Sequence, residues 1–512
     1  MIVICLQHLN ASSCQVIKKE GEYGFRFRNH HTGSDMDRFF TVTEKTLKNI
    51  CRCIIAVMLL CCLASFAFSG KTSFFIAGVT AFVGIAGYIC VKTKIYLDKR
   101  FWIILFISGV VAKLFVALFI HADIVNDMKR CLSAAQSTLQ GDMSWQEDKY
   151  FIQYGFQIPF VLYEAFVLKL FNSTTMLYFI NALLSIATAI LIKQIVSNMV
   201  NDEYTSWFIS TIYMLLPSTF LRVSVLYNQI LGGFFLTLGI LIYSSYCRSR
   251  KRIAQLFVSG IILGIGSIFR QDVAIVFIAI ICTEAFMRLK ELLKNTRNCQ
   301  ASKGYMTAVL SLLLFVVGYF CAVKGVDYVL RVFKLAKYGI GNSTPLHTII
   351  QGLSPENAGY YSEKYEILDT ETQNMGLLQG IRYIINYIST AENMNIFDWV
   401  YFAIRKTYAM WGSVEGAYAL LESHSITNIA ALTIACMEVP FYCGILGFAL
   451  YGMKKEYNNE ILLFSVCIIG YFIAYAIAEI KPRYRYNPMI CLFLLASFGV
   501  LRIKKTNTIK RC

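Results

Sequence analysis

Long apolar runs alternate with short polar hinges along almost the whole chain. The runs cover about residues 50–69, 73–91, 101–120, 151–171, 174–197, 204–224, 226–246, 253–269, 273–287, 305–323, 427–451, 460–479 and 484–501. Each is close to the roughly 20 residues that a helix needs to cross about 30 Å of hydrocarbon. Because lipid offers no partners to backbone amides, and because the runs lack the alternation of barrel strands, each run should be helical. The pattern predicts an all-α polytopic integral membrane protein with about 12–14 transmembrane helices.

The composition strengthens this prediction. Of 512 residues, 57% are hydrophobic and 15% are charged, and the mean hydropathy is +0.55. An ordinary soluble domain is far less apolar. Polar sequence is confined to the hinges, the first 49 residues, and the stretch before residue 427. We therefore expect no large soluble domain.

Lysine and arginine indicate the orientation in the membrane. Basic residues gather at 92–100, 248–252, 288–303, 454–455 and 502–512. Short basic loops stay on the cytoplasmic side, so these hinges and both termini should be cytoplasmic in a multi-pass plasma membrane protein. The loops at 121–150, 270–272, 325–426 and 480–483 then lie outside. The net charge of +17 reflects this bias and attraction to anionic lipids rather than nucleic-acid binding.

The number of apolar runs between residues 150 and 247 does not fit this orientation. An odd number of crossings must connect the outer loop at 121–150 with the inner loop at 247–252, yet this interval holds four apolar runs. Either one run lies in the interface or re-enters, or one splits into two short helices.

The same features divide the chain. Residues 1–49 are predicted as a cytoplasmic tail, 50–99 as two N-terminal transmembrane helices, and 100–324 as a transmembrane module with its first external loop at 121–150. A long external region at 325–426 precedes the C-terminal transmembrane helices at 427–502 and a cytoplasmic tail at 503–512.

Two acids follow directly after an apolar run, in the stretch HADIVNDMKR. A carboxylate beside a membrane span is costly unless it faces water or a cavity, so Asp123 and Asp127 are candidates for function. On a helix, their four-residue spacing would put both on one face. The alternative is that they only mark the end of a helix and pair with Lys129 or Arg130.

The sequence lacks the motifs of several enzyme classes. It has no phosphate-binding P-loop, no G-x-S-x-G, no H-E-x-x-H and no dinucleotide fingerprint. An ATP-driven pump is therefore not favoured.

An aromatic border closes the first predicted external loop. Residues 150–159, YFIQYGFQIP, follow the pattern YF-x-x-Y-x-x-Q-x-P and include Tyr154 and Gln157. The border comes after an apolar helix, the aspartates and an amphipathic stretch rich in small residues.

Three later stretches continue the pattern in order. MLLPSTFLRVSVLYNQILGG joins two apolar helices through an elbow at Asn228, and GIGSIFRQD ends an apolar helix with Arg270. AEIKPRYRYNPMI places Arg483 and Tyr484 before the last span. Over about residues 100–502 the chain resembles the C-type membrane glycosyltransferases, such as the protein O-mannosyltransferases and the aminoarabinose transferases of glycosyltransferase family 39. The acid that this family commonly has near Asn228 is absent.

The resemblance implies a function and a set of site residues. Such enzymes move a sugar from a polyprenyl-phosphate donor to a glycan, lipid or protein acceptor on the outer face. Asp123 would act as a base or orient the acceptor, with Asp127 supporting it or sharing a metal site; a need for Mg²⁺ or Mn²⁺ stays open. The donor phosphate would contact Arg483, Arg270 and Tyr484, and the cavity would be lined by Tyr154, Gln157, Asn228, Lys406 and Trp411.

Two other functions remain in view. A flippase or transporter of lipid-linked saccharides should carry ionisable residues at mid-membrane depth or an inverted repeat. A polysaccharide polymerase or ligase would share the long external region but would rely on arginine and histidine there, and His347 and His424 are available.

Overall fold

The computed structural model describes residues 16–19, 22–25, 32–67, 98–249, 253–295, 301–341, 346–412, 428–454 and 458–509. The predicted apolar run at 73–91 and His424 lie outside these residues. Within them the fold is all-α, as predicted, apart from a short antiparallel hairpin of β1 (Val16–Lys19) and β2 (Glu22–Phe25).

The helices are given in chain order, in three consecutive sets. The first comprises α2 (Thr32–Ala67), α4 (Lys99–Phe119), α5 (Asn126–Leu139), η3 (Ser144–Glu147), α6 (Lys149–Gln153), η4 (Gly155–Gln157) and α7 (Ile158–Phe171). The second comprises α8 (Thr175–Val200), α9 (Glu203–Leu215), α10 (Pro217–Leu221), η5 (Arg222–Ser224), α11 (Gln229–Ser249), α12 (Ile253–Phe269), α13 (Val273–Asn295) and α14 (Ala301–Val332). The third comprises α15 (His347–Gly352), η6 (Glu363–Tyr365), α16 (Ile367–Thr372), α17 (Leu377–Ala391), α18 (Ile396–Trp411), α20 (Asn428–Gly452), α21 (Asn459–Ile477), η7 (Pro482–Arg485) and α22 (Tyr486–Ile509).

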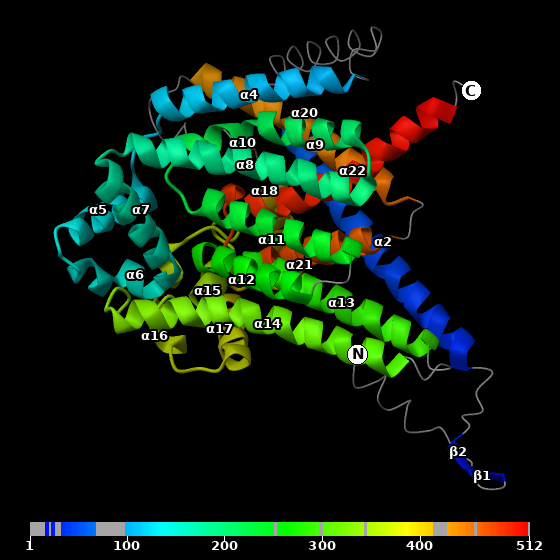
Figure 1. Ribbon diagram of the computed structural model, residues 1–512. Coiled ribbons are helices and arrows are strands. Elements are labelled where there is room, and N and C mark those ends of the chain that lie inside the picture. Colours follow the sequence, from blue (N-terminus) through cyan, green and yellow to red (C-terminus); the bar gives the residue numbers. More distant parts are fainter. Residues whose placement is uncertain are drawn as a thin grey trace.

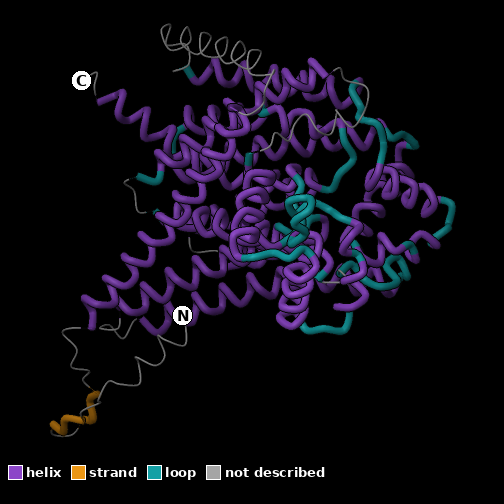
Figure 2. Tube along the Cα trace, turned by 180° about the vertical axis from the view of Figure 1, so that it is seen from behind, coloured by secondary structure: helices purple, strands orange, loops and turns teal. Residues whose placement is uncertain are grey.

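The long helices run roughly alongside one another and form a bundle, while α5, α6, α7, α16 and α17 gather at one end of it (Figure 1). Loops also collect at that end when the molecule is seen from behind (Figure 2). Among the described helices, seven are long and apolar enough to cross a membrane: α2, α4, α8, α11, α14, α21 and α22. The chain is therefore a multi-pass helical membrane protein.

The structure gives a physical answer to the inconsistent count of crossings. Helix α7 has 14 residues and packs mainly against α5 at the end of the bundle instead of running through it (Figure 1). The chain then passes along the bundle in α8, returns in α9 and α10, which are separated at Leu216, and passes again in α11. The helices between the two loops thus make three passes along the bundle, and the run at 151–171 lies at its end.

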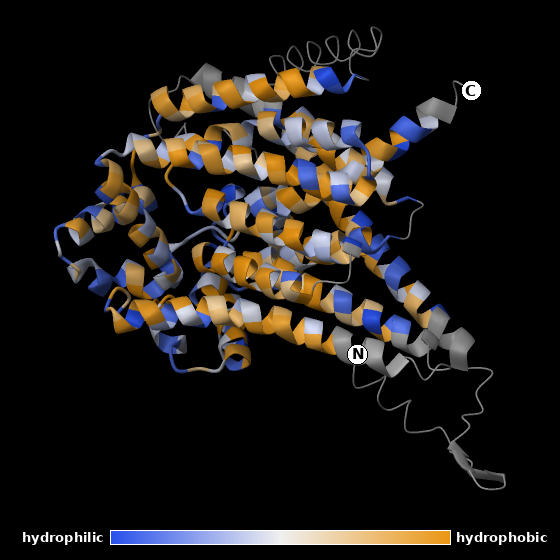
Figure 3. Ribbon diagram, viewed as in Figure 1, coloured by the Kyte–Doolittle hydropathy of each residue, from blue (hydrophilic) through white to orange (hydrophobic). Residues whose placement is uncertain are grey.

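The two ends of the bundle differ in polarity. At the end away from α5–α7, ion pairs join neighbouring helix ends: Lys99 with Glu203 at 2.6 Å, Lys504 with Asp202 at 2.5 Å, and Lys290 with Glu44 at 2.5 Å. Apolar residues cover the helix surfaces between the ends (Figure 3). The described residues Lys99, Lys290 and Lys504 from hinges predicted as cytoplasmic therefore lie at this end, which we call the basic end. The opposite end, with α5–α7, is the loop end.

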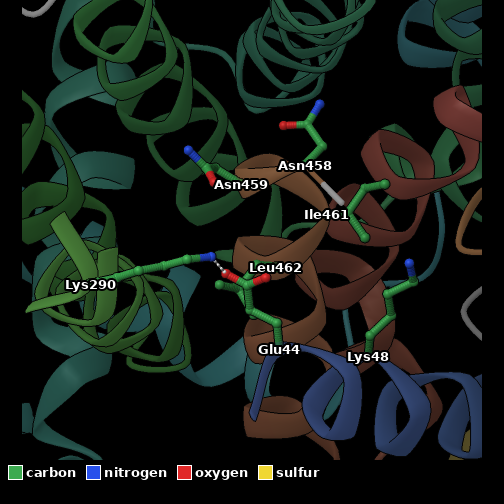
Figure 4. A pocket seen from close by; sticks show the side chains of 7 residues that line it. All are labelled: Glu44, Lys48, Lys290, Asn458, Asn459, Ile461 and Leu462. Atoms are coloured by element: carbon green, nitrogen blue, oxygen red, sulfur yellow. Dashed lines mark hydrogen bonds and ion pairs between the residues drawn. The ribbon is translucent and has the colours of Figure 1, made fainter. Parts of the chain in front are cut away.

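A small cavity of about 90 Å³ opens at the basic end, where α2, α13 and α21 meet (Figure 4). The Lys290–Glu44 pair borders it, together with Lys48 and Asn458. All predicted site residues lie at the loop end, so this cavity is separate from them.

Helix α22 is the centre of the bundle. Its residues from Ile490 to Leu495 have no exposed surface, and it packs against α8, α9, α11, α20 and α21. Because the helix is apolar on all sides here, it is stable only when other helices surround it.

Residues 346–412, from the region predicted to be external, form a unit over the loop end, which we call the external unit. It has a small core of Leu346, Ile350, Tyr365, Leu368, Ile384 and Ile388. Gln146 joins the first external loop to the segment that follows α14: its side-chain amide donates to the Lys334 carbonyl and accepts from the Lys337 amide, at 3.2 and 2.7 Å. Lys149 forms an ion pair with Glu366 at 2.6 Å. The first external loop and the later external region therefore make one continuous cap.

Helices α12 and α14 approach each other through glycines. A Cβ atom at Gly260 would lie 2.2 Å from the Phe315 carbonyl oxygen, and one at Gly318 would lie 2.4 Å from the Phe257 carbonyl oxygen. Small residues permit this close backbone contact between membrane helices.

We predict that Gly260→Leu destabilises the protein by about 3 kcal/mol, because the added side chain must push the α14 backbone away. The measurement is thermal unfolding in detergent. Gly325→Leu, on α14 itself but with open space around the new Cβ, is the matched control and should unfold like the wild type. Equal stability of the two variants would contradict the close packing of α12 on α14.

Candidate functional site

An ion pair joins the first external loop to the start of the last helix. Arg483 lies in η7, just before α22, and its Nη2 donates to Oδ2 of Asp127 in the first turn of α5, at 2.7 Å. Burial acts to raise the pKa of the Asp127 carboxyl, but the positive charges of Arg483 and Lys481 outweigh it, so the pKa lies below its ordinary value. Asp127 is therefore an ionised partner of Arg483.

A second arginine lies beside the first. The guanidinium of Arg270 is 4.5 Å from the centre of the Tyr484 ring, and that of Arg483 is 5.9 Å from the same ring. Arg483 also lies 4.2 Å from the ring centre of Tyr227. Two cations from distant parts of the sequence thus share one tyrosine. Such contacts favour guanidinium groups over ammonium groups.

Asp272 orients the side chain of Arg270. It forms an ion pair with the Arg270 Nε at 3.5 Å and accepts hydrogen bonds from Tyr475 and Asn487, both at 2.8 Å. Since Tyr475 is on α21 and Asn487 on α22, both helices help to orient Arg270.

A chain of amides leads from Arg270 into the first external loop. Arg270 donates to the Asn228 side-chain oxygen at 3.5 Å, and the Asn228 amide donates to Gln157 at 3.1 Å. Gln157 in turn donates to the Tyr150 hydroxyl at 3.3 Å. Three residues predicted from separate motifs, Arg270, Asn228 and Gln157, are therefore in one hydrogen-bonded network.

Asp123 does not lie where the sequence suggested. Helix α5 begins at Asn126, and residues 120–125 have no helical structure. The expectation that Asp123 and Asp127 share a helix face is therefore wrong. Asp123 is exposed, and no hydrogen bond or ion pair links its side chain to another described residue.

Tyr154 leads to a pair that the sequence analysis did not connect with it. Its hydroxyl lies 2.7 Å from Nε2 of His347, and His347 Nδ1 lies 2.6 Å from Oδ2 of Asp369. Gln153 donates to the same carboxylate oxygen at 3.3 Å. His347 and Asp369 are buried, whereas Tyr154 is half-buried. Asp369 was missed because it lies more than 200 positions away in an external stretch with no recognisable motif.

Lys406, on α18 within the external unit, is buried. Its ammonium group donates to the backbone carbonyls of Gly352 and Ala478, the latter at 2.9 Å. Burial lowers the pKa of Lys406 to about 7, and the Glu479 carboxylate acts in the opposite direction. Lys406 thus ties α18 to α15 and to the segment before η7.

Trp411 is also buried. Its backbone carbonyl accepts a hydrogen bond from Arg485 at 3.2 Å, and its ring packs near Phe472 and Tyr475 of α21. It reaches the arginine site only through Tyr475, which bonds to Asp272. Trp411 therefore packs against a residue that helps to orient Arg270, and it does not contact Arg270 itself.

The described residues contain no group of three or more histidine, cysteine, aspartate or glutamate side chains arranged to hold a metal ion. Asp127 is already paired with Arg483, so it does not form a ligand set with Asp123. Within the part of the chain that the structure describes, Asp123 and Asp127 therefore do not fit the divalent metal site that the sequence left open.

The pKa of Lys406 leads to a stability prediction. Between about pH 7 and about 10.5, the unfolded chain holds a proton on Lys406 that the folded protein has released. Stability therefore rises with pH across this window, by at most about 5 kcal/mol. In Lys406→Met this rise should be smaller, as measured by thermal unfolding of both proteins from neutral to alkaline pH. Parallel curves would contradict the buried position of Lys406.

Comparison with known proteins adds little to this geometry. No family model and no curated protein matches the chain. Among solved structures it is similar to the apo oligosaccharyltransferase of Archaeoglobus fulgidus, with 12% identity and a TM-score of 0.30, over 77% of this chain and 56% of that one. The same enzyme tethered by a disulfide to an acceptor peptide with an NVT sequon gives 13% identity and a TM-score of 0.29, with the same coverage. The chain thus spans little more than half of that enzyme's length. At these scores the likeness is too distant to transfer a function.

Proposed function

We propose that this protein is a membrane glycosyltransferase that takes one sugar from a polyprenyl-phosphate donor at the loop end of the bundle. The observation that carries the proposal is the pair of guanidinium groups, Arg270 and Arg483, that both lie near the Tyr484 ring. Both come from elements that the helix bundle holds in place, and both are at the end opposite the basic hinges.

The presence of Arg270 and Arg483 at the loop end requires an explanation. Short basic segments are usually cytoplasmic, and the basic end already contains the hinges expected there. A phosphate ligand supplies the reason, because the planar guanidinium fork binds phosphate oxygens in a bidentate way and keeps its charge.

One donor group at the site also favours an anionic ligand. The Nε of Arg483 is buried and has no hydrogen-bond partner among the described residues. Buried polar groups are nearly always paired, so an acceptor oxygen is expected beside it. Asp127 binds Nη2 of Arg483 and leaves Nε without a partner among the described residues.

The rest of the proposal follows from the position of the site. A lipid-linked donor would keep its chain in the bilayer beside the bundle and present its phosphate to Arg270 and Arg483. Gln157, Asn228 and Tyr154 would line the sugar side. An acceptor hydroxyl that attacks opposite the phosphate would invert the anomeric centre. The acceptor would be a glycan, a lipid or a protein of the cell envelope, with the loop end of the protein facing outward.

A polysaccharide polymerase or ligase is the second candidate. An enzyme of that kind is expected to depend on arginine and histidine in the external region. His347 is hydrogen-bonded to Tyr154 in the aromatic border that follows the first external loop, which is the observation in favour of this function. The two functions differ in their donor, since a polymerase or ligase acts on a glycan carried by a lipid diphosphate.

A transporter has weaker support. Helix α4 carries Lys113, which is fully buried and donates to Ser185 at 2.9 Å, and the sequence analysis did not identify it as an ionisable residue within a span. Lys113 has a defined partner, and it lies apart from the arginine site.

The decisive experiment follows loss of label from radiolabelled donors in membranes that contain the protein. The donor panel includes polyprenyl-phosphate sugars and a polyprenyl-diphosphate glycan. Wild type should consume a monophosphate donor, and Arg483→Lys and Arg270→Lys should each lower kcat/KM by about tenfold to a hundredfold. This range corresponds to the loss of a charge-assisted hydrogen bond.

Arg405→Lys is the matched control, because Arg405 is an exposed arginine of α18 that lies outside the arginine site. It should react like the wild type. Consumption of the diphosphate donor alone would favour the polymerase or ligase, and no consumption of any donor by folded protein would refute both. Asp123→Asn in the same assay tests the base that the sequence predicted.

A further inference from the structure

The contact between the aromatic border at residues 150–159 and the external unit has the geometry of a proton relay. Asp369, His347 and Tyr154 follow one another at 2.6 and 2.7 Å. Glu479, four residues before Arg483, donates its backbone amide to the carbonyl of Thr348 at 2.7 Å. Helix α15, which begins with His347, is therefore fixed beside the arginine site.

Hydrogen-bonding chemistry gives the direction of the relay. An ionised carboxylate only accepts, so the Asp369 oxygen requires a proton on Nδ1 of His347. In the neutral imidazole, Nε2 is then an acceptor, and the Tyr154 hydroxyl donates to it. This is the arrangement in which a histidine can take a proton and a carboxylate stabilises the resulting charge.

The burial and contacts of Asp369, His347 and Tyr154 are consistent with proton transfer through His347. The second oxygen of Asp369, Oδ1, is buried without a hydrogen-bond partner among the described residues, so Asp369 has an acceptor left over beside His347. Tyr154 is the member of the three that is partly exposed. Burial, followed by the charges of Glu479 and Asp127, raises the pKa of Tyr154, so the phenol does not ionise by itself and must lose its proton in step with gaining another.

We propose that Tyr154, backed by His347 and Asp369, removes the proton from the acceptor hydroxyl during sugar transfer. This inference rests on the proposed glycosyltransferase function and names the proton path within it.

The step balances as follows. The acceptor oxygen forms a bond to the anomeric carbon as the bond from that carbon to the phosphate oxygen breaks, and the phosphate leaves with the electron pair. The acceptor proton moves to Tyr154, and the proton of Tyr154 moves to His347. The imidazolium later returns its proton to water, by way of Tyr154.

The two aspartates of the first loop are poorer choices for this role. Asp127 is paired with Arg483, and its lowered pKa makes it a weak base. Asp123 is exposed, and among the described residues nothing orients its carboxylate.

The test uses Tyr154→Phe in full-length protein in membranes, with the monophosphate donor that the wild type consumes. General base catalysis contributes about a hundredfold or more, so kcat should fall by about that factor while the KM for the donor stays within about twofold. Azide, an anionic nucleophile that has no proton to lose, should then restore donor consumption by the variant and yield a glycosyl azide, identified by mass spectrometry. Asp369→Asn should lower kcat and respond to azide in the same way.

Tyr365→Phe is the matched control. Tyr365 lies in the same external unit and donates to Glu392 at 2.6 Å, so its loss removes a similar hydrogen bond away from the relay and should leave kcat unchanged. Normal turnover by Tyr154→Phe, or a loss that azide does not restore, overturns the relay and leaves the three residues as a structural tie. A wild type that consumes no monophosphate donor refutes the proposed function and the relay together, which separates that failure from the failure of the relay alone.

Discussion

The ion pair between Arg483 and Asp127 is the contact on which the arrangement of the site depends. It joins α5, which belongs to the first external loop, to η7, which precedes the central helix α22. A charge next to a membrane is costly unless it is paired or hydrated. The pairing therefore holds the first loop against the bundle, and it keeps Arg483 ionised close to Tyr484 and Arg270.

The same constraint explains why the two ends of the bundle differ. At the basic end, ion pairs such as Lys504 with Asp202 join neighbouring helix ends, and the cations there are numerous. At the loop end, Arg270 and Arg483 are each matched by one aspartate and lie against aromatic rings. The first pattern suits orientation in a membrane. The second suits an anion that approaches two oriented guanidinium groups, which is the basis of the proposed donor site.

Much of the fold could be predicted from the sequence, because apolar runs of a fixed length have one stable form in lipid. The helices α4, α8, α11, α12, α14, α21 and α22 lie where these runs predict them. The run at 151–171 shows the limit: its composition matches that of a spanning helix, but Pro159 and the preceding short turns let α7 pack on α5 at the end of the bundle. Hydropathy alone does not distinguish these two cases.

The site was partly predictable for a similar reason. Arg270, Asn228, Gln157, Arg483 and Tyr484 each lie at the polar border of an apolar run, and the structure brings all five together. The pairing of Asp369 with His347 was not predictable, since a contact between α15 and α16 in an external unit leaves no periodic signal. The position of Asp123 was misjudged because four-residue spacing places two side chains on one face only if the intervening residues are helical, and α5 begins after Asp123.

The most direct measurement for the donor site is lipid binding to the purified protein by native mass spectrometry, with decaprenyl phosphate and decaprenol as paired probes. If Arg270 and Arg483 form a phosphate site, the wild type binds the phosphate lipid in clear preference to the neutral alcohol, and the double variant Arg270→Gln/Arg483→Gln loses that preference while remaining folded. Equal binding of the two lipids by the wild type, or an unchanged preference in the double variant, would contradict the account.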